Sequence, residues 1–174
     1  EATPLLKISG TKALGAEIIL QGDNFDEAYA FALEYAKEHN LTFVHPFNDE
    51  FVQAGQGTIA LEMIEEVADL EYIVVPVGGG GLATGVCSCA KQINPDIKII
   101  AVAAKGAPAM HDSFVAKKPL NSKSVRTIAD GIAVRDTSEI TLSTIIECVD
   151  EFVQVDDEEI ASAILYLLEQ QKII

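Results

Sequence analysis

A chain of 174 residues is long enough for an ordinary globular domain, and a hydrophobic content of 49% argues against disorder. With 27 acidic against 12 basic residues the net charge is −15, which argues against nucleic acid or an anionic membrane as a partner. No apolar run approaches the roughly 20 residues of a spanning helix, and no signal peptide is visible. Three cysteines, an odd number, favour a reducing compartment, so we expect a cytoplasmic protein.

Two helices are expected near the beginning of the chain. We expect Thr3 to cap the first helix, with Pro4 at the first helical position, and Gly15 to end it. A second, amphipathic helix should follow Asp23 and Asn24, either of which could cap it, and should close at Asn40.

Short strands are expected after each of these helices, at 17–20 and at 41–44. A third helix should cover 51–67, interrupted early by Gly55 and Gly57. Its apolar side should consist of Ile59, Met63 and Val67, with Ala60 and Ile64 beside them.

A nearly continuous apolar run, 72–77, then ends at four glycines, Gly78–Gly81. The run predicts a strand buried on both faces, as in parallel sheets, and a helix should begin at Leu82. Such a junction presents backbone N–H groups at a helix N-terminus, so it favours an anion such as a phosphate. No Lys-Ser/Thr follows the glycines, and the spacing of a dinucleotide fingerprint is not met, which leaves the phosphate of a monophosphate cofactor as the better fit. A simple tight turn is the alternative.

The second half continues to alternate strands and helices, which predicts an α/β fold with a parallel sheet. Asp156, with Glu159 three residues later, resembles a capping box. The expected elements are a strand at 97–104, a loop at 105–108, a polar stretch at 117–126, a helix at 138–148, a strand at 152–155 and a last helix through Leu168.

Side chains with catalytic potential are few. His45 at a strand end could contact a ligand, although a structural role is the stronger interpretation, and the same holds for Asp130. Lys105 could bind an anion, pair with an acid or be a plain surface lysine. Cys87 and Cys89, two apart on a helix, point to different sides, and no zinc site is expected.

Several motifs in order resemble one family. They are Glu1-Ala2-Thr3-Pro4-Leu5, Lys12-Ala13-Leu14-Gly15-Ala16-Glu17, His45-Pro46-Phe47, Ala54-Gly55-Gln56-Gly57-Thr58-Ile59-Ala60-Leu61-Glu62, Pro76-Val77-Gly78-Gly79-Gly80-Gly81-Leu82, Gly106-Ala107-Pro108-Ala109-Met110 and Thr127-Ile128-Ala129-Asp130-Gly131. Together they resemble the threonine dehydratases (threonine deaminases), fold-type II pyridoxal phosphate enzymes with a tryptophan synthase β-like fold, with serine racemase as a close cousin. The resemblance covers essentially the whole chain.

The resemblance implies a site and a reaction. The loop Gly78, Gly79, Gly80, Gly81 and Leu82 would hold the phosphate of pyridoxal 5'-phosphate, and Gly131 would lie beside the cofactor ring. Threonine would lose its β-hydroxyl after removal of the α-proton and give 2-oxobutanoate and ammonia, and serine would give pyruvate. The cofactor would serve as the electron sink.

The resemblance also implies what the chain lacks. The family's Schiff-base lysine and its Ser-x-x-Asn loop would precede Glu1, so the chain is expected to be an internal fragment, truncated at both ends, with no catalytic residue of its own and no activity alone. The divalent-cation site of the serine racemase relatives would align with Lys105 and His111; a lysine there makes a metal improbable, and its ammonium could stand in for the cation.

By the same resemblance, residues 1–48 would belong to the small domain and 49–174 to the large, cofactor-binding domain, in a homo-oligomer. The alternatives are a serine racemase or serine dehydratase on the same scaffold, or a non-enzymatic phosphate-binding domain. The choice between threonine and serine stays open here, as does that between isoleucine biosynthesis and threonine catabolism.

Overall fold

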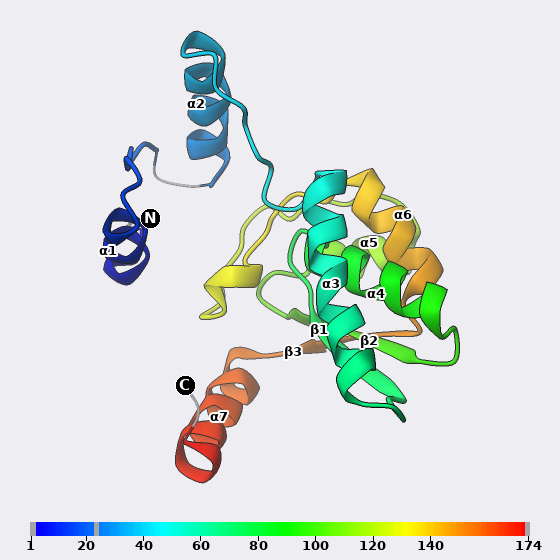
Figure 1. Ribbon diagram of the computed structural model, residues 1–174. Helices are drawn as coiled ribbons and strands as arrows, with labels where there is room; N and C mark the ends of the chain where they lie inside the picture. Colours follow the sequence, from blue (N-terminus) through cyan, green and yellow to red (C-terminus); the bar gives the residue numbers. More distant parts are fainter. Residues whose placement is uncertain (1–2, 23–24, 173–174) are drawn as a thin grey trace. The chain divides into compact units, whose positions relative to one another are not determined.

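The computed structural model describes residues 3–22 and 25–172, and these residues divide into two compact units between Val44 and His45. The elements are α1 (Leu5–Ala13), α2 (Phe25–Glu38), α3 (Glu50–Glu66), β1 (Tyr72–Pro76), α4 (Gly81–Ile93), β2 (Lys98–Ala104), α5 (Ala109–Ala116), η1 (Asp130–Ile132), α6 (Glu139–Cys148), β3 (Glu151–Val155), α7 (Asp157–Tyr166) and η2 (Leu167–Gln171) (Figure 1). In these ranges no helix has the length and apolarity needed to cross a membrane.

The first unit contains α1 and α2. α1 begins after Pro4, which is itself the N-cap, so the prediction that Thr3 caps it is wrong. The predicted stop is confirmed, since Gly15 adopts φ +85° directly after the C-cap. Asp23 and Asn24 lie outside the described residues.

The strands predicted at 17–20 and 41–44 are wrong: neither segment forms a strand. A strand exists only when a partner satisfies its backbone groups, and the described part of this unit contains no strand for either segment to pair with. Ile19 and residues 41–44 line a groove of about 510 Å³ together with residues of α2, so both segments lie beside that helix without forming strands.

The second unit is built on a parallel sheet in the order β1-β2-β3, as the alternating pattern predicted. Val74 pairs with Ile100, and Val102 pairs with Val153. Helices α3, α4 and α6 lie side by side along this unit (Figure 1).

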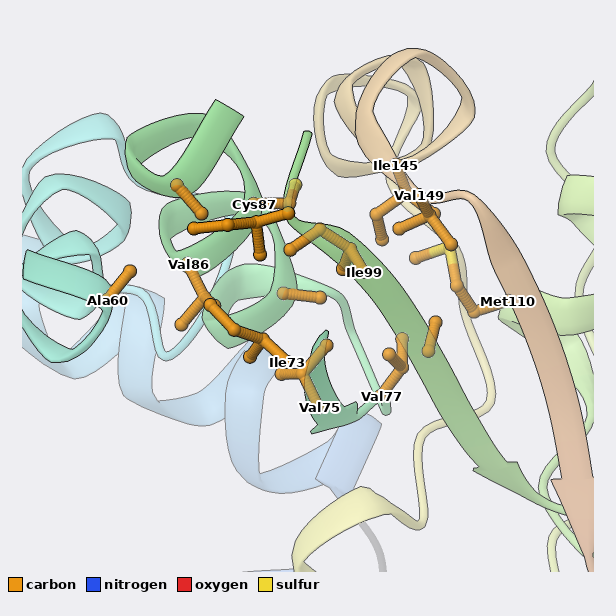
Figure 2. Close-up of a cluster of buried hydrophobic side chains, with 14 of the residues drawn as sticks. Ala60, Ile73, Val75, Val77, Val86, Cys87, Ile99, Met110, Ile145 and Val149 are labelled. Atoms are coloured by element: carbon orange, nitrogen blue, oxygen red, sulfur yellow. The ribbon is translucent and has the colours of Figure 1, made fainter. Parts of the chain in front are cut away.

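The core lies between the sheet and these helices. Figure 2 shows Ile73 and Val75 of β1 together with Val86 of α4 and Ile145 of α6. The prediction that β1 is buried on both faces is wrong, because Val74 on its opposite face is 63% exposed. β1 is an edge strand here, and its second face is not covered within the described residues.

α3 departs from its prediction in two ways. It runs without interruption through both glycines, and the predicted side is only partly right. Ala60 is buried and Ile64 packs against the core as predicted, but Ile59, Met63 and Val67 are exposed, while Gln53 and Gly57 are buried. The small residues are buried because α4 approaches α3 closely along this line.

The remaining elements follow the predictions closely. α4 begins one residue earlier than predicted, α6 starts after a Ser138 cap, and the capping box of Asp156 and Glu159 is confirmed by both of its hydrogen bonds. α5 was not predicted, since the sequence marks only the loop that precedes it.

Candidate functional site

The four glycines connect the end of β1 to the start of α4. In an open parallel sheet, ligands bind beyond the carboxyl ends of the strands, and this loop lies at that edge. Gly80 is the N-cap of α4 and has a backbone φ of +91°, which residues with a side chain rarely adopt. Because it is glycine, it provides no side-chain acceptor to cap the helix. The sequence-predicted junction is therefore present, with its sharpest bend at Gly80.

Each glycine of the loop is also required by packing. A Cβ on Gly79 would lie 2.5 Å from ring atoms of Phe47, and a Cβ on Gly80 would lie 2.9 Å from both Ile145 Cδ1 and Thr141 Cβ. Side chains cannot fit at such distances, so the N–H groups that the sequence predicts at this junction are only part of the reason for four glycines.

The two outer glycines make equally close contacts. A Cβ on Gly78 would lie 2.9 Å from the Cα of Ile132, and one on Gly81 would lie 2.7 Å from the Cα of Phe47. The loop is thus enclosed by the 45–48 turn on one side and the 130–134 segment on another.

The backbone N–H groups of this loop give the strongest indication of a ligand. Among the described residues, no acceptor is present for the N–H groups of 79–83, and Thr84 is the first to donate within the helix, to the Gly80 carbonyl at 2.8 Å. Gly79, Gly80 and Gly81 are buried, and buried donors normally have partners. Donors without partners at the positive end of a helix dipole fit an anion of phosphate type.

The carbonyl side of the loop is already bonded within the protein. The Thr141 hydroxyl, in α6, donates to the Gly79 carbonyl at 2.9 Å, and both residues are buried. The Gly79 carbonyl is therefore held by α6, while the N–H groups of the loop are available to a ligand.

Gly131 lies in η1, next to this loop. Its neighbour Ile132 makes the contact with Gly78, whereas a Cβ on Gly131 would have no heavy atom within 4 Å. The structure thus brings the predicted glycines of the two segments into one neighbourhood, with open space at Gly131. Leu82, the last residue of the predicted set, packs partly buried against the core.

The turn that covers the glycine loop is organised by His45. Its Nδ1 accepts the N–H of Phe47 at 3.2 Å and that of Asn48 at 2.9 Å, so this nitrogen must be unprotonated. Burial lowers the pKa of His45 below its usual 6.5, and the nearby Asp49 only partly opposes this. The structural role favoured from the sequence is the one observed.

Two further bonds hold the same turn against the helices. Gln53, in α3, donates from Nε2 to the Phe47 carbonyl at 2.9 Å, and the Ser138 hydroxyl donates to Asn48 Oδ1 at 2.7 Å. Phe47 is therefore fixed in front of Gly79 and Gly81.

Lys105 pairs with acids, which was one of its three sequence interpretations. Its Nζ lies 2.9 Å from Asp156 Oδ2 and 3.6 Å from Glu159 Oε2, and hydrogen bonding to Asp156 raises the pKa of Lys105. His111 lies 3.2 Å from Asp112 Oδ1. In the described part of the chain, no three acidic, histidine or cysteine residues cluster as metal ligands.

Sequence reasoning missed the residues that shape the loop from afar. Thr141 lies 62 positions from Gly79, and no local pattern connects them. In the same way, Asp157 accepts a hydrogen bond from Thr127, which lies 30 positions earlier in the chain. Phe47 was noted only as part of the His45-Pro46-Phe47 motif, whose contact with the glycines depends on the tertiary fold.

Comparison with known proteins identifies the family. The model of the "Pyridoxal-phosphate dependent enzyme" family matches residues 1–174. An L-threonine ammonia-lyase of Thermotoga maritima is 48% identical over 171 residues, which are 98% of this chain and 43% of that protein. A catabolic L-threonine dehydratase of Staphylococcus aureus is 42% identical over 174 residues, which are all of this chain and 50% of that protein.

Solved structures of similar fold include enzymes with related names. Processed threonine deaminase isoform 2 from Solanum lycopersicum matches with a TM-score of 0.92 at 38% identity, over 99% of this chain and 47% of that one. Maize serine racemase also gives a TM-score of 0.92, at 33% identity, over 97% of this chain and 52% of that one. The chain spans about half the length of the relatives it matches. It belongs to the family of pyridoxal-phosphate dependent enzymes.

Proposed function

We propose that the whole protein, meaning the natural polypeptide that contains these 174 residues, is an L-threonine ammonia-lyase. Threonine would lose its α-proton and β-hydroxyl as water, and hydrolysis would then release ammonia and 2-oxobutanoate; L-serine would give pyruvate. The observation that carries this proposal is the 48% identity, across 98% of the chain, to a protein named L-threonine ammonia-lyase.

The glycine loop fits the phosphate of pyridoxal 5'-phosphate. The N–H groups of Gly79, Gly80, Gly81 and Leu82 would bind the phosphate oxygens, because no acceptor among the described residues uses them. When bound, the cofactor supplies an electron sink for the substrate carbanion. The contribution of this chain is to hold the phosphate end and to exclude water there by packing.

Gly131 is proposed to lie beside the cofactor ring, and Gly78 to belong to the loop that holds the phosphate. The space at Gly131 is open, and its neighbour Ile132 already contacts the glycine loop, which supports this position. By the resemblance, no lysine in these 174 residues corresponds to the lysine that carries the cofactor. We therefore expect the 174 residues alone to be inactive.

We further propose that residues 1–48 belong to the small domain and 49–174 to the large one. The division of the described chain into two units between Val44 and His45 supports a boundary in this region. A cytoplasmic homo-oligomer is proposed from the resemblance.

The test is to purify the whole protein with pyridoxal phosphate and supply L-threonine and L-serine separately. Formation of 2-oxobutanoate faster than pyruvate would support the proposal. Formation of D-serine from L-serine without 2-oxobutanoate would favour the second candidate, a serine racemase, for which the maize enzyme is the supporting likeness. Cofactor binding without turnover of either amino acid would leave a phosphate-binding domain.

A further inference from the structure

The carboxylate of Asp157, in the first turn of α7, binds a segment 30 positions earlier in the chain. Its Oδ1 accepts a hydrogen bond from the Thr127 hydroxyl at 2.6 Å, and its Oδ2 accepts the Ile128 N–H at 3.2 Å. The Thr127 oxygen in turn accepts the Ala129 N–H at 3.1 Å. Both oxygens of one half-buried carboxylate therefore hold residues 127–129.

This segment leads directly to the glycine loop. The Ala129 carbonyl accepts the Ile132 N–H at 3.1 Å, which closes the short helix η1 around Gly131. Ile132 is the residue whose Cα would lie 2.9 Å from a Cβ on Gly78. One end of the segment is thus bound by Asp157 and the other end contacts the proposed phosphate site.

The start of α7 does not need this carboxylate. Asp156 is the N-cap: it accepts the Glu159 N–H at 3.0 Å, and the Glu159 carboxylate accepts the Asp156 N–H at 2.8 Å. Lys105, after β2, binds Asp156 at 2.9 Å and so ties the helix start to the sheet. The helix is capped and anchored by other groups, and the Asp157 carboxylate bonds outward to the neighbouring segment.

We propose that Asp157 is a positioning residue for the cofactor site. It fixes residues 127–132 against the glycine loop and so sets where Gly131 lies relative to the bound cofactor. This inference rests on the proposed function, although the contact between Asp157 and Thr127 can be tested without it.

The experiment uses the whole protein with two disrupting variants. Asp157→Asn keeps the shape but replaces one carboxylate oxygen with a donor, so the side chain can no longer accept from both the Thr127 hydroxyl and the Ile128 N–H. Thr127→Val removes the hydroxyl without changing the size. Glu158→Gln is the matched control. It is also an acid-to-amide change, and it lies at the exposed neighbouring position in α7. Thr127→Ser retains the hydroxyl and serves as the conservative rescue.

Two measurements are made on each variant. Amide hydrogen exchange of the cofactor-free protein reports on Ile128 and Ala129, with the core strand β2 as the internal check that the variant is folded. Titration with pyridoxal phosphate, followed by the visible absorbance of the bound cofactor, gives its dissociation constant and its spectrum.

We expect Asp157→Asn and Thr127→Val to speed exchange at both amides. Each should weaken cofactor binding by roughly tenfold, the ratio given by about 1.4 kcal/mol, and alter the spectrum. The two substitutions share the bond between Asp157 and Thr127, so the double variant should lose less affinity than the sum of the two single losses. Thr127→Ser should weaken cofactor binding by less than twofold.

The inference is overturned if Asp157→Asn matches Glu158→Gln within twofold in cofactor affinity, with an unchanged spectrum. It is also overturned if exchange at Ile128 and Ala129 is unaffected. A wild-type protein that binds no pyridoxal phosphate would instead overturn the proposed function, while the exchange result would still decide whether Asp157 holds the segment.

Discussion

Gly57 in α3 and Gly85 in α4 bring the two helices into backbone contact. A Cβ on Gly57 would lie 3.2 Å from the Gly85 carbonyl oxygen, and a Cβ on Gly85 would overlap the Gln53 carbonyl oxygen. α3 holds the Phe47 turn through Gln53, and α4 begins with the glycine loop, so this close approach connects the two walls of the candidate site.

We expect Gly85→Ala to lower the free energy of unfolding of the whole protein by roughly 2 kcal/mol, because an added methyl group overpacks this contact. Gly55, also within α3 but exposed and with no atom within 4 Å of its Cβ position, is the matched control. Gly55→Ala should raise the free energy of unfolding by about 0.5–1 kcal/mol through helix propensity. Urea denaturation measures both; equal effects of the two substitutions would contradict the close packing.

Asp150, in the turn between α6 and β3, connects α4 with β2. Its carboxylate accepts bonds from Lys91 Nζ at 2.7 Å, the Ile99 N–H at 2.8 Å and Lys98 Nζ at 3.0 Å. Burial alone would raise the pKa of Asp150, but these donors outweigh it and hold the pKa well below the usual 3.8. Asp150→Asn should therefore cost roughly 1.5–3 kcal/mol of unfolding free energy at pH 7, the range for bonds to charged groups.

The sign of the pH dependence follows from this lowered pKa. The stabilisation from Asp150 is fully present above the usual carboxyl pKa and is lost as the pH falls through and below it, because the unfolded chain takes up a proton first. Wild-type protein should thus lose its advantage over Asp150→Asn as the pH is lowered from 5 toward 2. The exposed Asp96 offers the control Asp96→Asn, which should show no such convergence.

The sequence predicted elements well where the signal is local. The capping box of Asp156 and Glu159 and the Gly15 stop need only neighbouring residues, and each is observed. The strands at 17–20 and 41–44 failed because a strand depends on a partner that lies elsewhere.

In the candidate site, too, the features that depend on neighbouring residues were predictable and those that depend on the tertiary fold were not. The glycine loop and its place at the end of a parallel strand follow from the pattern of residues 72–82. The reason that Gly79 and Gly80 cannot carry side chains lies in Phe47, Thr141 and Ile145, and these contacts arise only when the chain folds.

His45 should make the turn over the glycine loop sensitive to acid. Its pKa is lowered by burial, so the unfolded chain binds a proton before the folded one, and stability should fall as the pH drops below about 6.5. His45→Ala should cost about 1 kcal/mol at pH 8, because two N–H groups lose their acceptor. His45→Asn places an oxygen near the Nδ1 position and should retain most stability while removing this pH dependence. Thermal unfolding between pH 5 and 8 checks all three proteins; a pH dependence that persists in His45→Asn would assign it to another group.

Substitutions at Gly80 and Gly131 should distinguish a glycine that is required by packing from a glycine that leaves space for the cofactor. Gly80→Ala puts a methyl group 2.9 Å from Thr141 and Ile145 at φ +91°, so it should lower the free energy of unfolding by roughly 2–3 kcal/mol and weaken pyridoxal phosphate binding as well. Gly80→Asp should weaken cofactor binding further, since it adds a negative charge where a phosphate is proposed.

Gly131→Ala enters open space, so its unfolding free energy should stay within about 0.5 kcal/mol of the wild type. If the cofactor ring lies beside this residue, as we propose, the added methyl group should nevertheless reduce cofactor affinity by several-fold. The two measurements, denaturation of the cofactor-free protein and titration with pyridoxal phosphate, must therefore diverge at Gly131 and move together at Gly80. Unchanged affinity in Gly131→Ala would remove Gly131 from the site, and unchanged affinity in Gly80→Asp would remove the loop, because an anion cannot be held where a carboxylate causes no loss.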